Sequence, residues 1–391
     1  MDTRLSEFQI PVGFKDILPL EAQLRRKLKE GFFRLFNQWS YQEIIPPCLE
    51  YYEQLRGSSK EEELFKLIEP SGRVLALRPD LTTPIARMAA THLKDNSLPI
   101  RLCYFGNAYR YEGIQVGRQR EFEQAGVELL GAPGVGADAE MVALAVESLR
   151  LSGLADFQLG IGQVAITHGL LEDVGVPAAE IENVKLLMTR KDFVGLEEKL
   201  LQLDLPKERG QEIRAIFSLR GGGKTLDKIK GIAKSETITK AIEDLKEVYS
   251  ALEVLGLTKH IFFDFSILRD FDYYTGIVFE GYAAGFGYPI CGGGRYDGLL
   301  GKFGWAVPAV GFAIGIDRLV GALPKEEKKS MDVLVVGGNL ADRLQEANLL
   351  RKQGLGVEVE ILDKDREEIK AYQLRKNIAK LVEVKGEKTD G

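Results

Sequence analysis

Two neighbouring segments with the pattern of long β-strands constrain the fold of this chain most strongly. They are RLCYFGNAYRYE (101–112) and REFEQAGVELLG (120–131), and a polar, glycine-containing loop over 113–119 separates them. Both segments are rich in the apolar and aromatic residues that strands favour, and the short connection is typical of antiparallel neighbours. The sequence therefore predicts a long β-hairpin over residues 101–131.

Helical and strand patterns alternate around this hairpin. Residues 20–39 carry apolar side chains at helical spacing behind Pro19, and residues 84–93 also have a helical pattern. From about 155 to 258 the leucine-, lysine- and glutamate-rich sequence predicts a helical insertion. Further strands are expected in RVLAL (73–77), HIFFDFSIL (260–268) and YYTGIVFEGY (273–282). The predicted fold class is α+β.

The last part of the chain has a different organisation. The segment PKEEKKS (324–330) is rich in proline, lysine and glutamate, and it is the expected linker. After it, DVLVVGG, GVEVEIL and AKLVEVKG alternate with two helical segments, which predicts a small β/α unit. We therefore expect a core over residues 1–325 and a C-terminal α/β unit over residues 331–391.

Composition narrows the classes of partner and cofactor. No stretch approaches the roughly 18 consecutive apolar residues of a membrane span, and the first residues lack a signal peptide's apolar run, so a cytoplasmic protein is expected. The net charge of −6 and the pI near 5.5 disfavour tRNA as a partner. The three cysteines form no CxxC pair and are expected in the core. The three histidines lack metal-ligand spacing, so no metal site is expected. No other cofactor is expected either.

The hairpin carries the first candidate binding residues. Gln124, Gly126 and Glu128 share one face of the second strand by period two, so the two polar side chains lie about 13 Å apart with a gap between them. The residues that share a face of the first strand change from small to charged: Gly106, Ala108, Arg110 and Glu112. A floor of small residues with polar groups at its ends suits a small polar ligand. The alternative is a solvated outer face with ordinary surface charges.

Other candidates lie outside the hairpin and have structural alternatives. Asp80 follows a strand and precedes TTPIARMAA, where it could simply cap a helix. Arg269, Tyr273 and Tyr274 follow an apolar strand. An arginine there can be a surface charge, and paired tyrosines can serve packing alone. The pattern by itself leaves these alternatives open.

Five segments together resemble the histidyl-tRNA synthetase family. They are LRPDLTTPIAR (77–87), RYEGIQVGRQREFEQAGVELLG (110–131), LRDFDYYTGIVFE (268–280), GGGRYDGLL (292–300) and AVGFAIGIDRL (309–319). Their order and spacing extend through nearly all of residues 8–323. The resemblance implies a class II aminoacyl-tRNA synthetase-like fold, which is an antiparallel sheet flanked by helices and is usually dimeric.

The same resemblance implies a histidine pocket. It places Asp80, Thr82 and Gln124 around the α-ammonium group. It places Arg269 near the carboxylate, and Glu128 with Tyr274 at the imidazole. These roles fit the chemistry, because carboxylate and amide oxygens accept from N–H groups and a guanidinium matches a carboxylate.

The resemblance also marks neighbouring positions. Arg110 and Tyr273 complete the residues expected around histidine. The remnant of an ATP site is expected at Arg110, Glu112 and Arg318, because the two arginines match family positions that contact ATP.

Departures from the family's usual sequence argue against tRNA charging. The usual RPEGT is RPDLT here, with Asp80 and Leu81, and the usual FHQ has Glu123 at its middle position. A new acid and a bulkier side chain near the reaction centre would disfavour adenylate chemistry. The C-terminal unit resembles the start of an anticodon-binding domain but stops after about three strands.

GRQREFEQAGVELLG and the short C-terminal unit instead resemble the synthetase paralogues that serve as regulatory subunits of ATP phosphoribosyltransferase. This implies a non-catalytic subunit that binds L-histidine and partners a short-form ATP phosphoribosyltransferase catalytic subunit, as a homodimer within a hetero-oligomer. The expected function is in the first step of histidine biosynthesis and its feedback inhibition. The alternatives are a histidyl-tRNA synthetase and another synthetase paralogue with a different acceptor.

Overall fold

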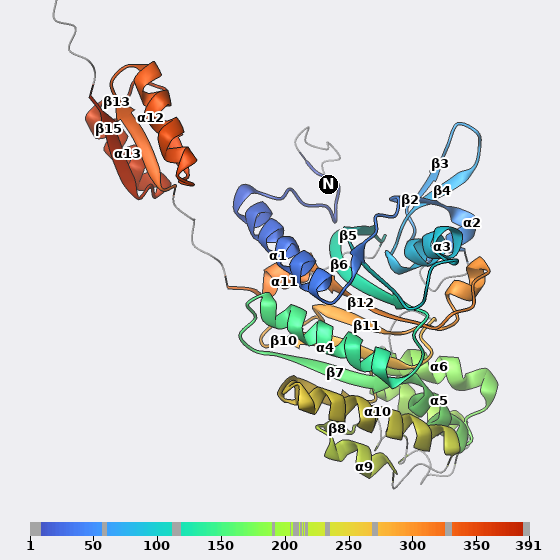
Figure 1. Ribbon diagram of the computed structural model, residues 1–391. Helices are drawn as coiled ribbons and strands as arrows, with labels where there is room; N and C mark the ends of the chain where they lie inside the picture. Colours follow the sequence, from blue (N-terminus) through green and yellow to red (C-terminus); the bar gives the residue numbers. More distant parts are fainter. Residues whose placement is uncertain are drawn as a thin grey trace, which may run out of the picture. The chain divides into compact units, whose positions relative to one another are not determined.

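The predicted hairpin forms the second and third strands of the nine-stranded sheet that the described residues build. Strands β5 (Ile100–Tyr109) and β6 (Glu121–Leu130) pair antiparallel along their full length, which confirms the hairpin. Strand β12 (Ala309–Gly315) pairs antiparallel with the other edge of β6. Segments far apart in the sequence therefore lie side by side in the sheet (Figure 1).

The computed structural model describes residues 9–385 apart from 57–60, 112–118, 190–191, 204, 206–210, 212, 214, 216–217, 231–234, 268–272 and 325–330. The chain divides into two compact units, Met1–Leu323 and Pro324–Gly391. No helix within these described ranges is long and apolar enough to cross a membrane.

Most neighbouring strands of the large sheet are antiparallel. The order across it is β1 (Gln42–Glu43), β5, β6, β12, β11 (Cys291–Arg295), β10 (Ile277–Ala283), β7 (Phe157–Gln163), β9 (Ile261–Asp264) and β8 (Arg220–Gly221). The pairs β1–β5 and β7–β9 are parallel, so the sheet is mixed. Both parallel pairs are joined through long connections that contain helices, as parallel strands require.

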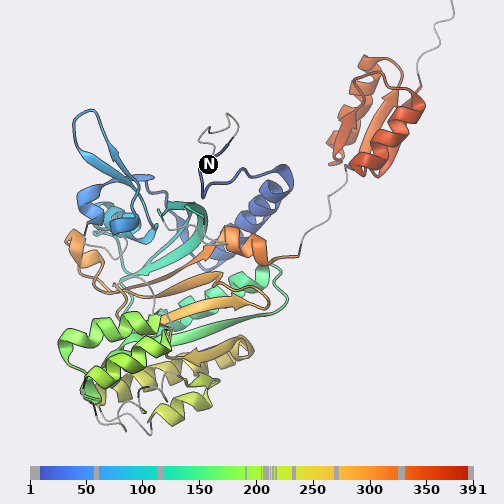
Figure 2. The same cartoon turned by 180° about the vertical axis from the view of Figure 1, so that it is seen from behind.

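One face of the sheet is covered by helices and buries the larger core. The helices are α1 (Pro19–Gln38), α4 (Val135–Leu151), α10 (Glu236–Val254) and the short α11 (Ile316–Ala322) (Figures 1 and 2). On β6, Ala125, Val127 and Leu129 point into this core. Successive strand residues point to opposite faces, so Gln124 and Glu128 face the other side, as period two predicted.

The opposite face carries a second, smaller core beside α3 (Thr82–His92). Leu81, Ile85 and Tyr104 are buried there. Helix α3 packs against η3 (Leu300–Phe303), and its Arg87 forms an ion pair with Glu50 of β2 (Leu49–Tyr51). The same part of the chain contains α2 (Tyr52–Leu55), η1 (Glu61–Glu63), β3 (Lys66–Ile68) and β4 (Val74–Leu77). Strands β2, β4 and β3 form a small antiparallel sheet of their own.

The segment expected as a helical insertion over about 155–258 begins with a strand of the large sheet. Strand β7 pairs with both β10 and β9, and its alternate residues Phe157, Leu159 and Ile161 enter the larger core. The alternation of core-facing residues over these seven positions therefore predicts a strand better than the helical pattern of the sequence that follows it. The helical elements are α5 (Val164–Asp173), α6 (Ala178–Thr189), α7 (Phe193–Gln202), α9 (Lys224–Lys230), α10 and η2 (Thr258–His260).

The C-terminal unit has the predicted β/α alternation. Strand β13 (Val333–Gly337) lies between β14 (Val357–Val359) and β15 (Lys380–Val384), and both pairs are parallel. Helix α12 (Leu340–Lys352) packs on one face of this sheet, and α13 (Arg366–Lys376) packs on the other. The central strand β13 is buried on both faces, which explains its almost uninterrupted apolar sequence.

Candidate ligand-binding site

A cavity of about 340 Å³ lies over the middle strands of the large sheet. On its floor, Glu128 of β6 faces Gly311 of β12, and Gly126 faces Ala313. Gly311 and Ala313 leave space above the sheet. The small residues that the strand pattern placed in this floor, Gly106, Ala108 and Gly126, do not line the cavity, because Tyr104 packs over Gly126 and Leu81 over Gly106. The volume is within the roughly 300–1,000 Å³ that small-molecule sites occupy.

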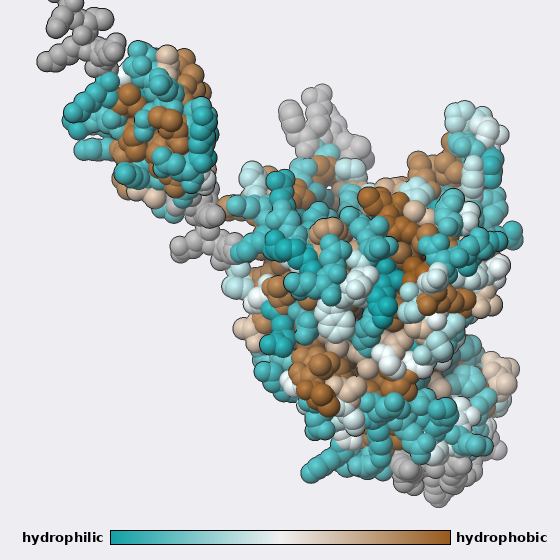
Figure 3. Space-filling model, in the orientation of Figure 1, coloured by the Kyte–Doolittle hydropathy of each residue, from teal (hydrophilic) through white to brown (hydrophobic). Residues whose placement is uncertain are grey.

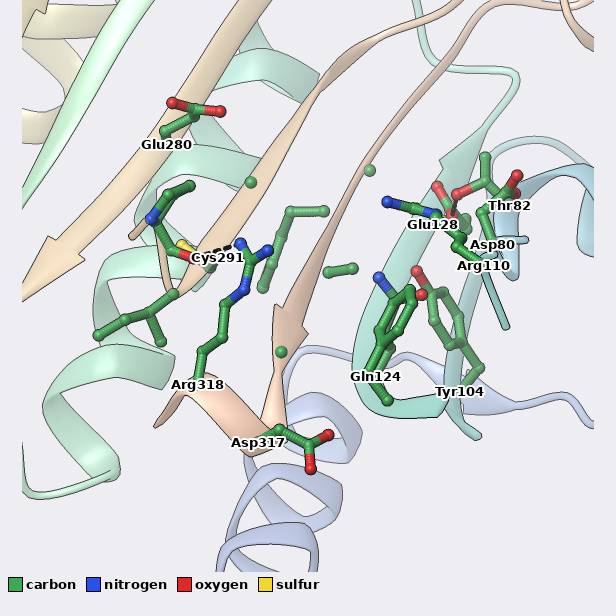
Figure 4. A pocket seen from close by; sticks show the side chains of 18 of the residues that line it. Asp80, Thr82, Tyr104, Arg110, Gln124, Glu128, Glu280, Cys291, Asp317 and Arg318 are labelled. Carbon is green, nitrogen blue, oxygen red and sulfur yellow. Dashed lines mark hydrogen bonds between the residues drawn. The ribbon is translucent and has the colours of Figure 1, made fainter. Parts of the chain in front are cut away.

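The cavity brings together all the predicted site residues that the structure describes. They are Asp80, Thr82, Arg110, Gln124, Glu128, Tyr273, Tyr274 and Arg318. The other two predicted positions, Arg269 and Glu112, lie outside the described residues. Figure 4 shows two groups, with Gln124, Glu128 and Asp80 on one side and Arg318 on the other. Residues predicted for histidine and residues predicted for ATP therefore share one cavity.

Glu128 is surrounded by hydroxyl groups. Its side chain is 1% exposed, Thr82 Oγ1 donates to Oε1 at 2.8 Å, and the Tyr296 hydroxyl donates to Oε2. Burial raises the pKa of Tyr296 and of Tyr104 well above its ordinary value, so both phenols keep their protons. Burial also raises the pKa of Glu128 to about 8, against the lowering effect of these hydroxyl donors. The cavity thus holds an acid that a positively charged ligand would stabilise in its ionised form.

Asp80 caps a helix and also lines the cavity. Its Oδ1 accepts a hydrogen bond from the Thr83 N–H at 2.8 Å, at the start of α3. Burial raises the pKa of Asp80, and the nearby Arg110 guanidinium opposes that rise. Arg110 is oriented by a 2.8 Å hydrogen bond from Nε to the Pro79 carbonyl. The two alternatives for Asp80 are therefore compatible.

Gln124 presents an unsatisfied polar atom. Its Oε1 is buried and has no hydrogen-bond partner within the described part of the chain. A buried acceptor in this state costs about 1–3 kcal/mol, which a donor from a ligand would recover. Gln124 lies on the same strand face as Glu128 and lines the same cavity. An ammonium group is a suitable donor at this position.

Aromatic rings form another wall of the cavity. The ring centroids of Tyr273 and Tyr274 are 4.9 Å apart, and Tyr273 packs edge-on against Tyr296 at 5.7 Å. A Cβ atom on Gly294 of β11 would lie 2.9 Å from the Tyr274 ring, so the close approach requires glycine. The tyrosine pair therefore packs tightly and also lines the cavity.

Arg318 lies in the other half of the cavity, on α11. One terminal nitrogen donates to the Pro289 carbonyl at 2.9 Å, drawn as a dashed line in Figure 4. The adjacent Asp317 accepts from the Glu123 N–H at 2.7 Å and from the Arg25 guanidinium. These bonds connect α11 with β6 and α1 directly behind this half of the cavity.

Comparisons with known proteins identify the family. The family model described as Histidyl-tRNA synthetase matches residues 13–319. A Moorella thermoacetica protein named ATP phosphoribosyltransferase regulatory subunit is 44% identical to this chain, over 93% of this chain and 95% of that protein. The chain belongs to the family of ATP phosphoribosyltransferase regulatory subunits. The prediction of a regulatory subunit is thereby confirmed.

Solved structures agree with this assignment. The crystal structure of a Bacillus halodurans protein, described as an ATP phosphoribosyltransferase regulatory subunit/histidyl-tRNA synthetase, has a TM-score of 0.87 and 33% identity, covering 98% of this chain and 100% of that one. Histidyl-tRNA synthetase from Nostoc has a TM-score of 0.83 at 24% identity, covering 96% and 90% of the two chains. The regulatory-subunit family thus shares the synthetase fold, and the predicted class II fold is confirmed.

Two of the departures from synthetase sequences lie away from the cavity. Leu81 is 1% exposed and packs in the second core. Glu123 points toward α1, where Lys29 Nζ donates to it at 2.6 Å. Neighbouring strand residues face opposite ways, so Glu123 and Gln124 cannot both enter the cavity. The inference that residues 81 and 123 alter the reaction centre is therefore wrong, whereas Asp80 does line the cavity.

Several cavity residues are absent from the sequence-based set, among them Tyr104, Glu280, Cys291 and Tyr296. Tyr104 could have been found, because it precedes Gly106 by two residues and faces Gly126 across the hairpin. The other three depend on the pairing of distant strands, which the pattern does not reveal. Of the cysteines expected in the core, Cys103 and Cys291 are buried, but Cys48 is exposed.

The unliganded protein is expected to lose stability as the pH rises from about 5 to about 9. Folding raises the pKa of Glu128 from 4.5 to about 8, so the folded state retains a proton that the unfolded chain releases. This contribution to the free energy of unfolding is complete below 4.5 and is lost as the pH rises through about 8. Its full size is on the order of 5 kcal/mol. Thermal unfolding should show that the Tm of the wild type falls as the pH rises from about 5 to about 9. The Tm of Glu128→Gln should depend less on pH. If the Tm of both proteins changed with pH in the same way, this account would be contradicted.

Proposed function

We propose that this chain is a cytoplasmic, histidine-binding regulatory subunit of a short-form ATP phosphoribosyltransferase. It supports the first step of histidine biosynthesis and makes that step sensitive to histidine. The observation that carries the proposal is the single cavity that combines buried Asp80 and Glu128 with the unsatisfied oxygen of Gln124. Family membership supports the transferase as the partner. The groups that line the cavity support histidine as the ligand.

Histidine matches the groups around this cavity. Its α-ammonium group offers three donors to Asp80 and Gln124, which removes the cost of the unsatisfied amide oxygen. Its imidazole offers an N–H to Glu128, whose position Thr82 and Tyr296 already determine. The nearby Arg110 guanidinium and Arg269 are the proposed partners of the histidine carboxylate.

The proposed regulation follows from thermodynamic linkage. Histidine is the end product of the transferase pathway, so a bound histidine reports that the pathway can slow. The ligand shifts the complex toward an inhibited state only if it binds that state more tightly than the active one. We expect the subunit to act as a homodimer within a hetero-oligomer that contains the catalytic subunit.

Isothermal titration calorimetry should show that the purified chain binds L-histidine and that Glu128→Gln weakens binding by roughly 1.5–3 kcal/mol, the range for a hydrogen bond to a charged group. Glu123→Gln is the matched control, because Glu123 lies on the same strand but faces α1. This control should bind histidine like the wild type. Equal affinity in all three proteins, or no binding heat in the wild type, would contradict the proposal that histidine binds in this cavity.

A synthetase activity is the second candidate, because Arg110 and Arg318, the predicted ATP contacts, both line the cavity. We nevertheless expect negligible charging of total tRNA with labelled histidine. The chain has an acidic pI of about 5.5, which does not favour binding of a polyanion. A histidyl-tRNA synthetase serves as the positive control. If this chain charged tRNA at a rate comparable to that of the control, the regulatory proposal would be contradicted and a synthetase activity would be supported.

A further inference from the structure

A buried ion pair lies directly beside one of the cavity residues. Arg295 ends β11 and precedes Tyr296, and Asp138 lies in the first turn of α4. Arg295 and Asp138 are 7% and 8% exposed. Arg295 Nη2 lies 2.7 Å from Asp138 Oδ1, and Nε donates to the same oxygen at 2.9 Å. Neither of the two side chains lines the cavity, so the pair can affect a ligand there only through other residues.

The guanidinium of Arg295 also connects the ends of neighbouring elements. Nη2 donates to the Gly134 carbonyl at 3.1 Å, and Nη1 donates to the Ala132 carbonyl at 3.2 Å. Both carbonyls belong to the turn between β6 and α4. Nη1 also donates to Asp297 Oδ1 at 3.2 Å, and the same oxygen accepts the Ala309 N–H of β12 at 3.0 Å. Each nitrogen of Arg295 therefore has an acceptor, and β6, α4 and β12 together determine its position.

The backbone at Arg295 holds two tyrosines of the cavity. The Thr275 N–H donates to the Arg295 carbonyl at 2.8 Å, directly after Tyr274 in the chain. Tyr296 follows Arg295, and its hydroxyl donates to Glu128. Both tyrosines line the cavity. A displacement of Arg295 would therefore move two of the groups that surround the ligand.

The Tyr296 hydroxyl depends on accurate placement. Tyr296 is 2% exposed and packs edge-on against Tyr273, with the ring centroids 5.7 Å apart. Hydrogen bonds weaken steeply when the distance or the angle departs from the preferred geometry. A small shift at the end of β11 would therefore weaken the bond from Tyr296 to Glu128. The Glu128 carboxylate would then lose one of the donors that determine its position.

We propose that Arg295, fixed by Asp138, is a positioning residue for histidine binding, which acts by placing the Tyr296 hydroxyl against Glu128. Burying an ion pair costs the hydration of both charges, so the pair is explained better by the position that it specifies than by a gain in stability. Removal of the Asp138 charge leaves the guanidinium buried without compensation, and Arg295 then shifts toward other acceptors. The effect on histidine rests on the proposed function, whereas the placement of Tyr296 does not.

Calorimetry of the full chain with histidine tests the proposal in two variants of α4. Asp138→Asn removes the charge that fixes Arg295 and should weaken histidine binding by about tenfold. Glu140→Gln is the matched control, because it also removes a carboxylate that α4 pairs with an arginine, in this case Arg101 of β5 at 2.8 Å. The control should bind histidine like the wild type. In a Tyr296→Phe background, Asp138→Asn should cause no further loss of affinity, because the hydroxyl through which it acts is absent.

Nuclear magnetic resonance of the chain labelled on its tyrosine rings tests the placement of Tyr296 without histidine. The Tyr296 signal, identified by its loss in Tyr296→Phe, should shift in Asp138→Asn and stay unchanged in Glu140→Gln. If Asp138→Asn does not fold, Asp297→Asn serves in its place, because Asp297 is the half-exposed acid on the same guanidinium. Asp297→Asn should shift the same signal and weaken histidine binding by about threefold.

Two results would overturn the proposal. One is wild-type histidine affinity in folded Asp138→Asn. The other is a loss of affinity from Asp138→Asn that is equally large with and without the Tyr296 hydroxyl, or that Glu140→Gln reproduces. A shifted Tyr296 signal in a chain that binds no histidine would support the placement of Tyr296 and contradict the proposed function instead.

Discussion

Replacing Gly311 with alanine is expected to abolish detectable histidine binding. Gly311 lies opposite Glu128 in the β12–β6 pair, and a Cβ atom there would lie 2.7 Å from Glu128 Cδ and would overlap its carboxylate. The Glu128 carboxylate would have to leave its hydrogen bonds with Thr82 and Tyr296. Loss of a positioned charged partner corresponds to about 3 kcal/mol, so we expect affinity to fall by about a hundredfold or more.

Calorimetry of Gly311→Ala beside Gly298→Ala separates this effect from a general intolerance of alanine. A Cβ on Gly298 would meet no atom within 4 Å, and Gly298 has no positive φ, so this control should bind like the wild type. Circular dichroism checks that both variants remain folded. Unchanged affinity in folded Gly311→Ala would show that Glu128 is not where histidine binds.

The second large effect is expected in the complex assembled with the transferase. Glu128→Gln should raise the histidine concentration for half-maximal inhibition by about ten- to a hundredfold, following the lost binding energy. The rate without histidine should stay close to that of the wild-type complex, because the substitution changes the histidine cavity and the transferase active site belongs to the partner. Glu123→Gln should be inhibited like the wild type. If histidine inhibited the Glu128→Gln complex and the wild-type complex equally, the cavity would not be the site through which histidine regulates the transferase.

The parts of this structure that were predictable from sequence are those that local periodicity determines. The alternation in residues 121–130 correctly placed Gln124 and Glu128 on one face, because a strand has only two faces. The same alternation should have placed Glu123 on the other face, since it directly precedes Gln124. Glu123 does lie on that other face, where it forms an ion pair with Lys29 of α1.

What the sequence could not provide is the register between distant strands. The cavity exists because β12 brings Gly311 and Ala313 beside β6, although a long stretch of chain separates the two strands. A shift of one residue would reverse the faces of β12, and no local pattern specifies which residues meet. Tyr296 and Glu280 enter the cavity through the same distant pairing. Leu81 shows the related difficulty that a changed residue beside a site residue can point into the core.

The most direct test of the proposed function is the activity of the short-form transferase measured against histidine concentration, with and without this chain. We predict that the complex is active and that histidine inhibits it, whereas the catalytic subunit alone shows no comparable histidine sensitivity. The regulatory account would be contradicted if the catalytic subunit alone were as active as the complex and equally sensitive to histidine.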